Sequence, residues 1–167
     1  DKTTLYDSGV RTPWIVRWPA KVKAGTVNPN LVSSVDIART FMDFAGAKYG
    51  DTFVGQSFAP MLENSKAGIR DYAFGEKNWH DFSDRCRYVR GERFKYIRNF
   101  YPHYPNTPSA DALRSPVFRT MQKLRDAGKL NAAQMNCFIK PRPKEELYDL
   151  ENDPYELNNL AGKPPYA

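Results

Sequence analysis

Residues 88–97, with the sequence Tyr-Val-Arg-Gly-Glu-Arg-Phe-Lys-Tyr-Ile, decide the fold of the second half of the chain. Two runs of aromatic and β-branched residues flank a Gly-Glu pair, which is the pattern of a β-hairpin with a tight turn. Because successive side chains of a strand point to opposite faces, Phe94 and Tyr96 should share one face, and Lys95 and Ile97 the other. The stretch therefore predicts an antiparallel sheet of the α+β type.

The segments around this hairpin extend the prediction. Short strands are expected at 71–75 and at 146–150, and a helix is expected from Pro116 to residue 124. The proline-rich stretch 101–115 has no clear periodicity and predicts a long exposed connection. At 153–156 the sequence Asp-Pro-Tyr-Glu has the pattern of a capping box, which predicts a short terminal helix.

The first part of the chain has a different pattern. Residues 12–18 form an apolar, β-branched and aromatic run that suits a covered strand of an α/β sheet. Residues 34–46 predict a helix, in which Ile37, Phe41 and Phe44 form one apolar stripe expected to pack in the core. We expect a boundary that separates residues 1–64 from the antiparallel subdomain at 65–167.

Composition limits the classes of protein. The chain has 167 residues, with 25 Lys and Arg against 19 Asp and Glu, a net charge of +6 that suits a polyanionic partner. No apolar run reaches the ~20 residues of a membrane helix. Cys86 and Cys137 lack the spacing of a thiol metal site and could form one disulfide or remain two buried thiols. A basic module that binds carbohydrate or another polyanion without catalysis is one hypothesis.

Two places could carry chemistry. Residues 76–85 combine both charge signs with the amide of Asn78, the indole of Trp79 and the imidazole of His80, which suits sugar recognition or proton transfer. The alternative is a polar loop that Trp79 anchors. Lys2 could stabilise a developing oxyanion as a point charge, although a lysine near a chain end is ordinarily solvated. Neither a GxSxG nor an HExxH motif is present.

Several segments resemble one enzyme family. Residues 2–13, Lys-Thr-Thr-Leu-Tyr-Asp-Ser-Gly-Val-Arg-Thr-Pro, closely resemble the K-x-T-x-Y-E-G-G-x-R-x-P segment of the formylglycine-dependent type I sulfatases. Residues 146–161 are similar to the closing E-L-Y-D-L-x-x-D-P-x-E-x-x-N-L-A motif of that family. Residues 78–81 and 94–99 resemble the branch near heparan N-sulfatase, also called sulfamidase.

The resemblance implies a fold and an activity. It implies the end of an alkaline-phosphatase-like α/β domain, followed by a small α+β subdomain with an antiparallel sheet and a terminal helix. The whole enzyme would hydrolyse sulfate esters or sulfamates of a sulfated, glycosaminoglycan-like carbohydrate. It would be periplasmic, secreted or lysosomal, with no nucleic-acid partner, and the chain could self-associate or pair with a missing N-terminal part.

The resemblance also assigns residues. Lys2 matches the sulfate-binding lysine of the family, and His80 and Asn78 match a loop that contacts the sugar. The formylglycine arises in a C/S-x-P-x-R motif that neither Cys86 nor Cys137 begins. That residue and the ligands of the Ca²⁺ ion are expected upstream, so we assign no metal ligand here and expect the fragment alone to be inactive.

Overall fold

The computed structural model describes residues 2–166. They form two compact units: the first runs up to Thr12 and resumes at Phe74, and the second comprises Pro13–Ala73. The predicted division into residues 1–64 and 65–167 stays a prediction about domains. Among the described residues, no helix is both long and apolar enough to cross a membrane.

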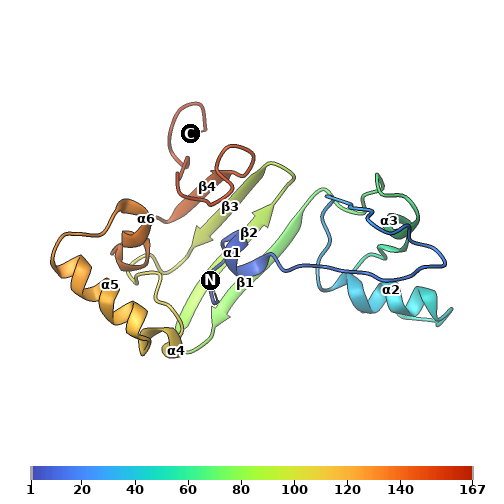
Figure 1. Cartoon of the computed structure of the whole chain (residues 1–167), viewed down its shortest axis with the longest axis horizontal. Coiled ribbons are helices and arrows are strands. Elements are labelled where there is room, and N and C mark those ends of the chain that lie inside the picture. The colour runs from blue at the N-terminus through green and yellow to red at the C-terminus, as the bar shows by residue number, and fades with distance from the viewer. Residues whose placement is uncertain (1, 167) are drawn as a thin grey trace. The chain divides into compact units, whose positions relative to one another are not determined.

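A four-stranded sheet is the centre of the first unit (Figure 1). Its strands lie side by side in chain order: β1 (Ala73–Trp79), β2 (Ser83–Arg90), β3 (Phe94–Asn99) and β4 (Glu145–Asp149). Strand β3 pairs antiparallel with both β2 and β4. The turn between β2 and β3 is closed by the Gly91 N–H, which donates to the Phe94 carbonyl at 2.8 Å. The predicted hairpin and final strand are confirmed.

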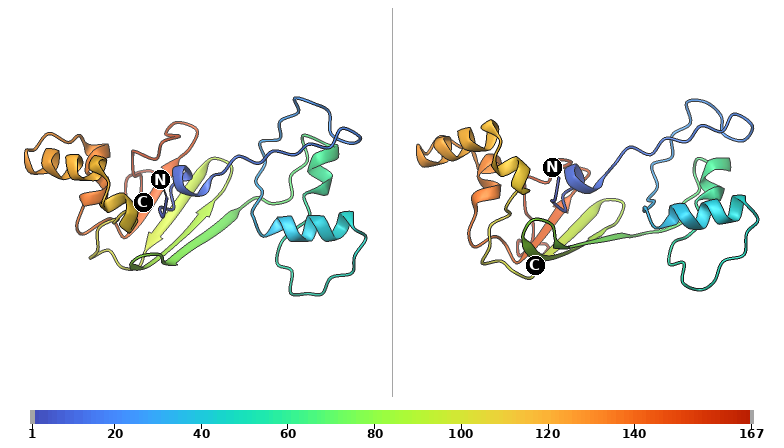
Figure 2. Two further views of the ribbon diagram at one scale, coloured as in Figure 1. Left: turned by 60° about the horizontal axis from the view of Figure 1, so that its bottom comes forward. Right: turned by 90° about the horizontal axis from the view of Figure 1, so that it is seen from below.

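Side chains alternate across β3 as the sequence predicted. Lys95 and Ile97 are buried on one face, whereas Phe94 is exposed on the other. Helix α1 (Asp7–Val10) lies against the sheet (Figures 1 and 2), and Tyr6, just before it, contacts the ring of Tyr148 edge-on at 5.9 Å. The beginning of the chain therefore packs on strands that come much later in the sequence.

Short helices lie beside the sheet in the same unit (Figure 2): α4 (Ala110–Leu113), α5 (Pro116–Asp126), α6 (Ala132–Met135) and a 3₁₀ turn at Asn136–Phe138. The predicted helix from Pro116 is confirmed. Its N-cap is Ser115, whose hydroxyl accepts from the Phe118 N–H at 3.1 Å. Phe118 is buried and packs against Phe138 at a ring distance of 5.4 Å.

The predicted terminal helix is wrong. The Asp153 carboxylate does accept hydrogen bonds, from the backbone N–H groups of Leu157 at 3.0 Å and Asn158 at 2.7 Å. Glu156, however, has a φ of 55°, a left-handed conformation that a right-handed helix cannot contain. The residues after β4 therefore form turns, and the Glu156 side chain is buried instead of closing a capping box.

The second unit confirms one helix and corrects its packing. Helix α2 (Asp36–Phe44) forms as predicted, and α3 (Ala59–Glu63) follows it. The apolar stripe is not a core in this structure, since the Phe41 side chain is 62% exposed and Phe44 is also exposed. Among the described residues of this unit only Ala73 belongs to a strand, so no sheet lies under the stripe.

A polar cluster holds this unit together instead. Asp36 is fully buried and accepts from the Ser33 N–H at 2.7 Å, from the Gln56 N–H at 2.8 Å and from the Arg70 guanidinium. The predicted strand at 12–18 is wrong in this structure: the segment has no ladder partner among the described residues, and Ile15 is exposed. Paired backbone groups are what define a strand within a sheet.

Candidate functional site

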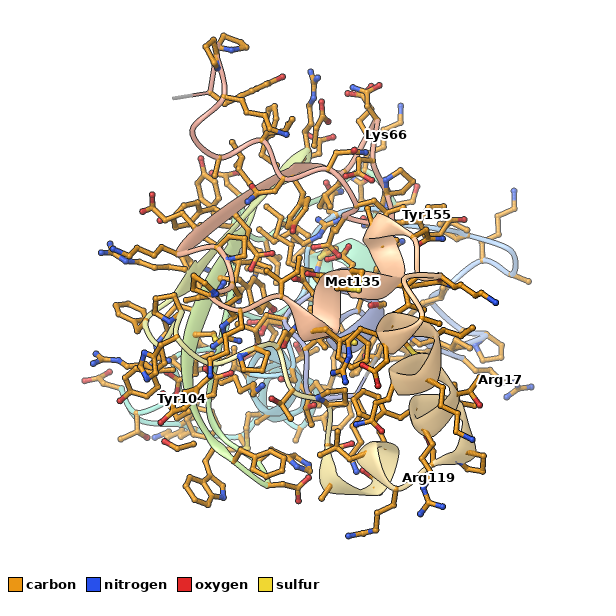
Figure 3. All side chains as sticks on the ribbon, turned by 90° about the vertical axis from the view of Figure 1, so that its left-hand side faces the viewer. Arg17, Lys66, Tyr104, Arg119, Met135 and Tyr155 are labelled. Atoms are coloured by element: carbon orange, nitrogen blue, oxygen red, sulfur yellow. The ribbon has the colours of Figure 1, made fainter. Side chains whose placement is uncertain are left out.

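A pocket of about 450 Å³ opens in the first unit, where the β1–β2 turn meets residues 104–109 and the N-terminal segment. We call it the aromatic pocket, because three exposed rings contribute to its wall. Figure 3 shows one of them, Tyr104, beside the strands of the sheet. The residues that line it are Thr3, Lys77, Trp79, His80, Asp81, Phe82, Ser83, Asp84, Tyr104, Pro105, Thr107, Pro108 and Ser109.

The fold brings one of the predicted site residues, His80, into the wall of this pocket, and a second, Lys2, directly precedes the lining residue Thr3. His80 lines it, with Nδ1 at 3.1 Å from the Asp81 carboxylate. Asp81 also accepts from the Ala110 N–H at 2.6 Å, and the next residue, Asp111, is paired with the Lys2 ammonium at 3.2 Å. The side chains of Lys2 and His80 are 61% and 41% exposed, so both can reach a ligand.

Asn78, the third predicted site residue, does not line the pocket with His80. Strand β1 extends to Trp79, so residues 76–79 belong to the sheet and not to a loop as expected. Asn78 alternates with the pocket residues Lys77 and Trp79, and its Oδ1 accepts from Arg87 Nη1 at 2.8 Å. Its role as a substrate contact stays a prediction.

The carboxylates beside Lys2 and His80 are held in their anionic form by their surroundings. Hydrogen bonding from the Ala110 N–H, aided by His80, lowers the pKa of Asp81 below its usual value. The pKa of Asp111 is lowered to about 2 by the nearby Ser109 hydroxyl and by the Lys2 ammonium. An exposed ion pair such as that of Lys2 and Asp111 stabilises little, so Lys2 can exchange Asp111 for an anionic ligand at small cost.

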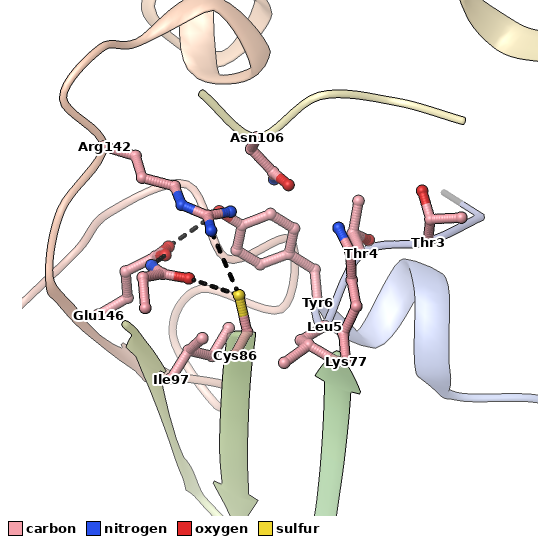
Figure 4. A pocket seen from close by; sticks show the side chains of 11 residues that line it. Thr3, Thr4, Leu5, Tyr6, Lys77, Cys86, Ile97, Asn106, Arg142 and Glu146 are labelled. Carbon is pink, nitrogen blue, oxygen red and sulfur yellow. Dashed lines mark hydrogen bonds between the residues drawn. The ribbon is translucent and has the colours of Figure 1, made fainter. Parts of the chain in front are cut away.

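Buried hydrogen bonds hold the N-terminal segment in place (Figure 4). Glu146 on β4 accepts from the hydroxyl group of Tyr6 at 2.8 Å. It also accepts from the Tyr148 hydroxyl at 2.5 Å and from the Asn99 amide at 2.6 Å. Burial, with the nearby Glu146 charge, raises the pKa of both tyrosines, so their hydroxyls remain protonated donors. Tyr6 is thereby fixed four residues after Lys2.

A buried ion-pair cluster around Lys95, whose side chain is 0% exposed, is a second anchor for the N-terminal segment, after the hydrogen bonds of Glu146. Its ammonium lies 2.8 Å from Asp7 Oδ1 and 3.0 Å from Glu156 Oε1, so helix α1 and the turns after β4 meet on β3. Arg90 contacts the other Asp7 oxygen at 3.3 Å. The role of Lys95 was not predicted from the sequence, although its alternation with Ile97 on the buried face of β3 was a signal for it.

The two cysteines are free thiols, which decides between the alternatives left open by the sequence. Cys86 is buried beside Arg142 (Figure 4), and it also contacts Asp84 and Asn99. Burial raises the pKa of the Cys86 thiol to about 12, which leaves it protonated and unreactive. The surroundings of Cys86 are therefore those of a packed core residue.

Asp84 should make the stability of the fold depend on pH. Burial alone would raise its pKa, but the hydrogen bonds and charges of Arg142 and Lys77 outweigh burial and lower it. A carboxylate with a lowered folded-state pKa stabilises the fold above its unfolded pKa of ~3.9, and this contribution is lost as the pH falls toward the folded-state pKa.

We therefore expect Asp84→Asn to reduce the free energy of unfolding by about 2 kcal/mol near pH 6 and by much less near pH 3. Urea unfolding of both proteins at each pH measures this, with the exposed Asp126→Asn as the control. A stability difference that stays constant across this pH range would contradict the assignment.

The described residues do not fit a metal site. No group of three or more His, Cys, Asp or Glu side chains within residues 2–166 could hold a metal ion. The described residues therefore supply no ligand set for a Ca²⁺ ion.

The fold and these motifs are those of the sulfatases. A family model described as "N-sulphoglucosamine sulphohydrolase, C-terminal" matches residues 1–116, and the chain belongs to this family. An "Ulvan-active sulfatase" of Formosa agariphila is 39% identical over 99% of this chain and 28% of its own length. Human "N-sulphoglucosamine sulphohydrolase" is 27% identical over 99% of this chain and 35% of its own length.

A solved structure has the same fold. It is described as a complex with its substrate D-glucosamine-2-N,6-O-disulfate, is 27% identical to this chain, and superposes with a TM-score of 0.70. The match covers 100% of this chain and 27% of the chain in that structure. The chain thus spans between about a quarter and a third of the length of these relatives. The predicted family and its α+β subdomain are confirmed.

Proposed function

We propose that this chain is the C-terminal part of a sulfatase that hydrolyses sulfate esters or sulfamates of a sulfated, glycosaminoglycan-like carbohydrate. The observation that carries the proposal is the series of contacts from His80 through Asp81 and residues 110–111 to Lys2, beside the pocket that His80 lines. The match of the whole chain to relatives named as sulfatases supports the same activity.

Each residue has a role in this proposal. Lys2 binds the sulfate group through its exposed ammonium, which is a compact positive charge. The same ammonium stabilises the negative charge that develops on the sulfate oxygens during cleavage. His80 contacts the sugar from the wall of the pocket, where Asp81 fixes the orientation of the imidazole ring. The nucleophilic formylglycine and a Ca²⁺ ion belong to the part of the enzyme outside residues 2–166.

The same proposal gives a partner and a compartment. The net charge of +6 suits a sulfated polysaccharide. A periplasmic, secreted or lysosomal location follows from the resemblance to the family.

The isolated 167-residue chain should release no sulfate from an aryl sulfate, because it contains neither the nucleophile nor a metal cage among its described residues. The complete protein should release sulfate from sulfated glucosamine oligosaccharides. Ion chromatography of free sulfate measures both. Release by the isolated chain that survives a chelator would contradict the proposal, as would a complete protein inactive on every sulfated sugar.

A further inference from the structure

The aromatic pocket differs from the surface around Lys2 in its chemistry. The rings of Trp79, Phe82 and Tyr104 are 69%, 46% and 51% exposed, and all three line the pocket. Exposed rings gathered at one concave site are a sign of ligand binding. Flat apolar surfaces with few polar groups suit the C–H faces of a pyranose ring, which also offers hydroxyl groups for hydrogen bonding.

The charges of the pocket disfavour a sulfate group. Among the residues that line it, Lys77 is paired with Asp84 at 3.0 Å, and His80 with Asp81 at 3.1 Å. No lysine or arginine in that lining is left without a carboxylate partner. A sulfate placed there would face two carboxylates and no free ammonium, and juxtaposed like charges weaken binding.

The pocket adjoins the sulfate-binding position. Thr3 lines the pocket and directly follows Lys2, and Asp81 in the pocket wall binds the N–H of Ala110, whose neighbour Asp111 is paired with Lys2. We propose that the aromatic pocket binds an unsulfated pyranose unit of the substrate, next to the sulfated unit that Lys2 contacts. This inference rests on the proposed function and adds a specificity for the pattern of sulfation.

The test uses the complete protein and three probes: p-nitrophenyl sulfate, a glucosamine disaccharide sulfated on one unit, and the same disaccharide sulfated on both. Trp79→Ala should raise KM for the singly sulfated disaccharide about tenfold. It should lower kcat/KM for p-nitrophenyl sulfate by a smaller factor, because that probe has no second pyranose unit to place in the pocket. Trp79→Phe, which keeps a ring, should restore KM.

A matched control is Phe74→Ala, since Phe74 is exposed on the same strand but lies outside the pocket. The wild type should bind the disaccharide sulfated on both units about tenfold more weakly than the singly sulfated one. Equal binding of the two disaccharides, or an unchanged KM in Trp79→Ala, would overturn the inference.

The experiment distinguishes failure of the proposed sulfatase function from failure of the pocket proposal. If the complete protein cleaves none of the three probes, the sulfatase assignment fails, whereas calorimetric titration with the disaccharides still measures the pocket. In that titration, loss of binding in Trp79→Ala with recovery in Trp79→Phe would support the pocket. Unchanged binding in Trp79→Ala would refute it.

Discussion

Lys95→Met is expected to lower the free energy of unfolding by about 3–5 kcal/mol, the usual cost of breaking a buried ion pair by removing one partner. Methionine can occupy the volume of the lysine stem, but it leaves the carboxylates of Asp7 and Glu156 without their shared cation. Both carboxylates are buried, so water cannot replace the ammonium. Urea unfolding followed by circular dichroism measures the loss.

The exposed Lys129 provides the matched control. Lys129→Met removes the same charge from the surface, and its effect on unfolding should stay within about 0.5 kcal/mol. A double variant, Lys95→Met with Glu156→Gln, should lose less than the two single changes added together, because both remove the same interaction. If Lys95→Met and Lys129→Met cost the same, the anchor around Lys95 contributes nothing.

Lys2→Ala in the complete protein should lower kcat/KM on a sulfated glucosamine substrate about 100-fold or more, the range found when one stabilising donor is removed from a developing oxyanion. Because Lys2 forms only an exposed pair with Asp111, its removal should leave the melting temperature unchanged. Steady-state kinetics and thermal melting of the same preparations separate the two effects.

Lys123→Ala is the control for this experiment, because Lys123 is an exposed lysine on α5 and does not line the pocket. Lys2→Arg keeps the charge but spreads it over a planar group, so it should retain part of the activity. Unchanged kinetics in Lys2→Ala would refute the assignment of Lys2 to sulfate binding, whatever the stability of the variant.

The local patterns predicted the elements well. The β2–β3 hairpin, strand β4 and helices α2 and α5 were predictable because alternation, periodicity and capping are properties of neighbouring residues. The capping-box pattern at 153–156 predicted a helix wrongly, because Glu156 makes a tertiary contact instead of capping a helix. Glu156 is needed beside Lys95, and this contact outweighs the local preference for a helix. The apolar stripe of α2 misled because a periodic pattern does not say what covers it.

The site was only partly predictable. Lys2 and His80 could be proposed from the sequence, but the contacts that link them run through residues 110–111, which carry no motif. Asn78 was grouped with His80 by adjacency, although alternation along β1 separates Asn78 from the pocket residues on either side. The rings of Phe82 and Tyr104 share a pocket only because two segments far apart in the sequence converge there.

By itself, the sequence determined the family of this protein and its hairpin, since both depend on short-range spacing. The tertiary structure decided that Lys95 is a buried anchor, that Cys86 and Cys137 remain thiols, and that a pocket forms beside Lys2. The physical reason is that burial and the pairing of charges depend on contacts between distant segments, which no local pattern records.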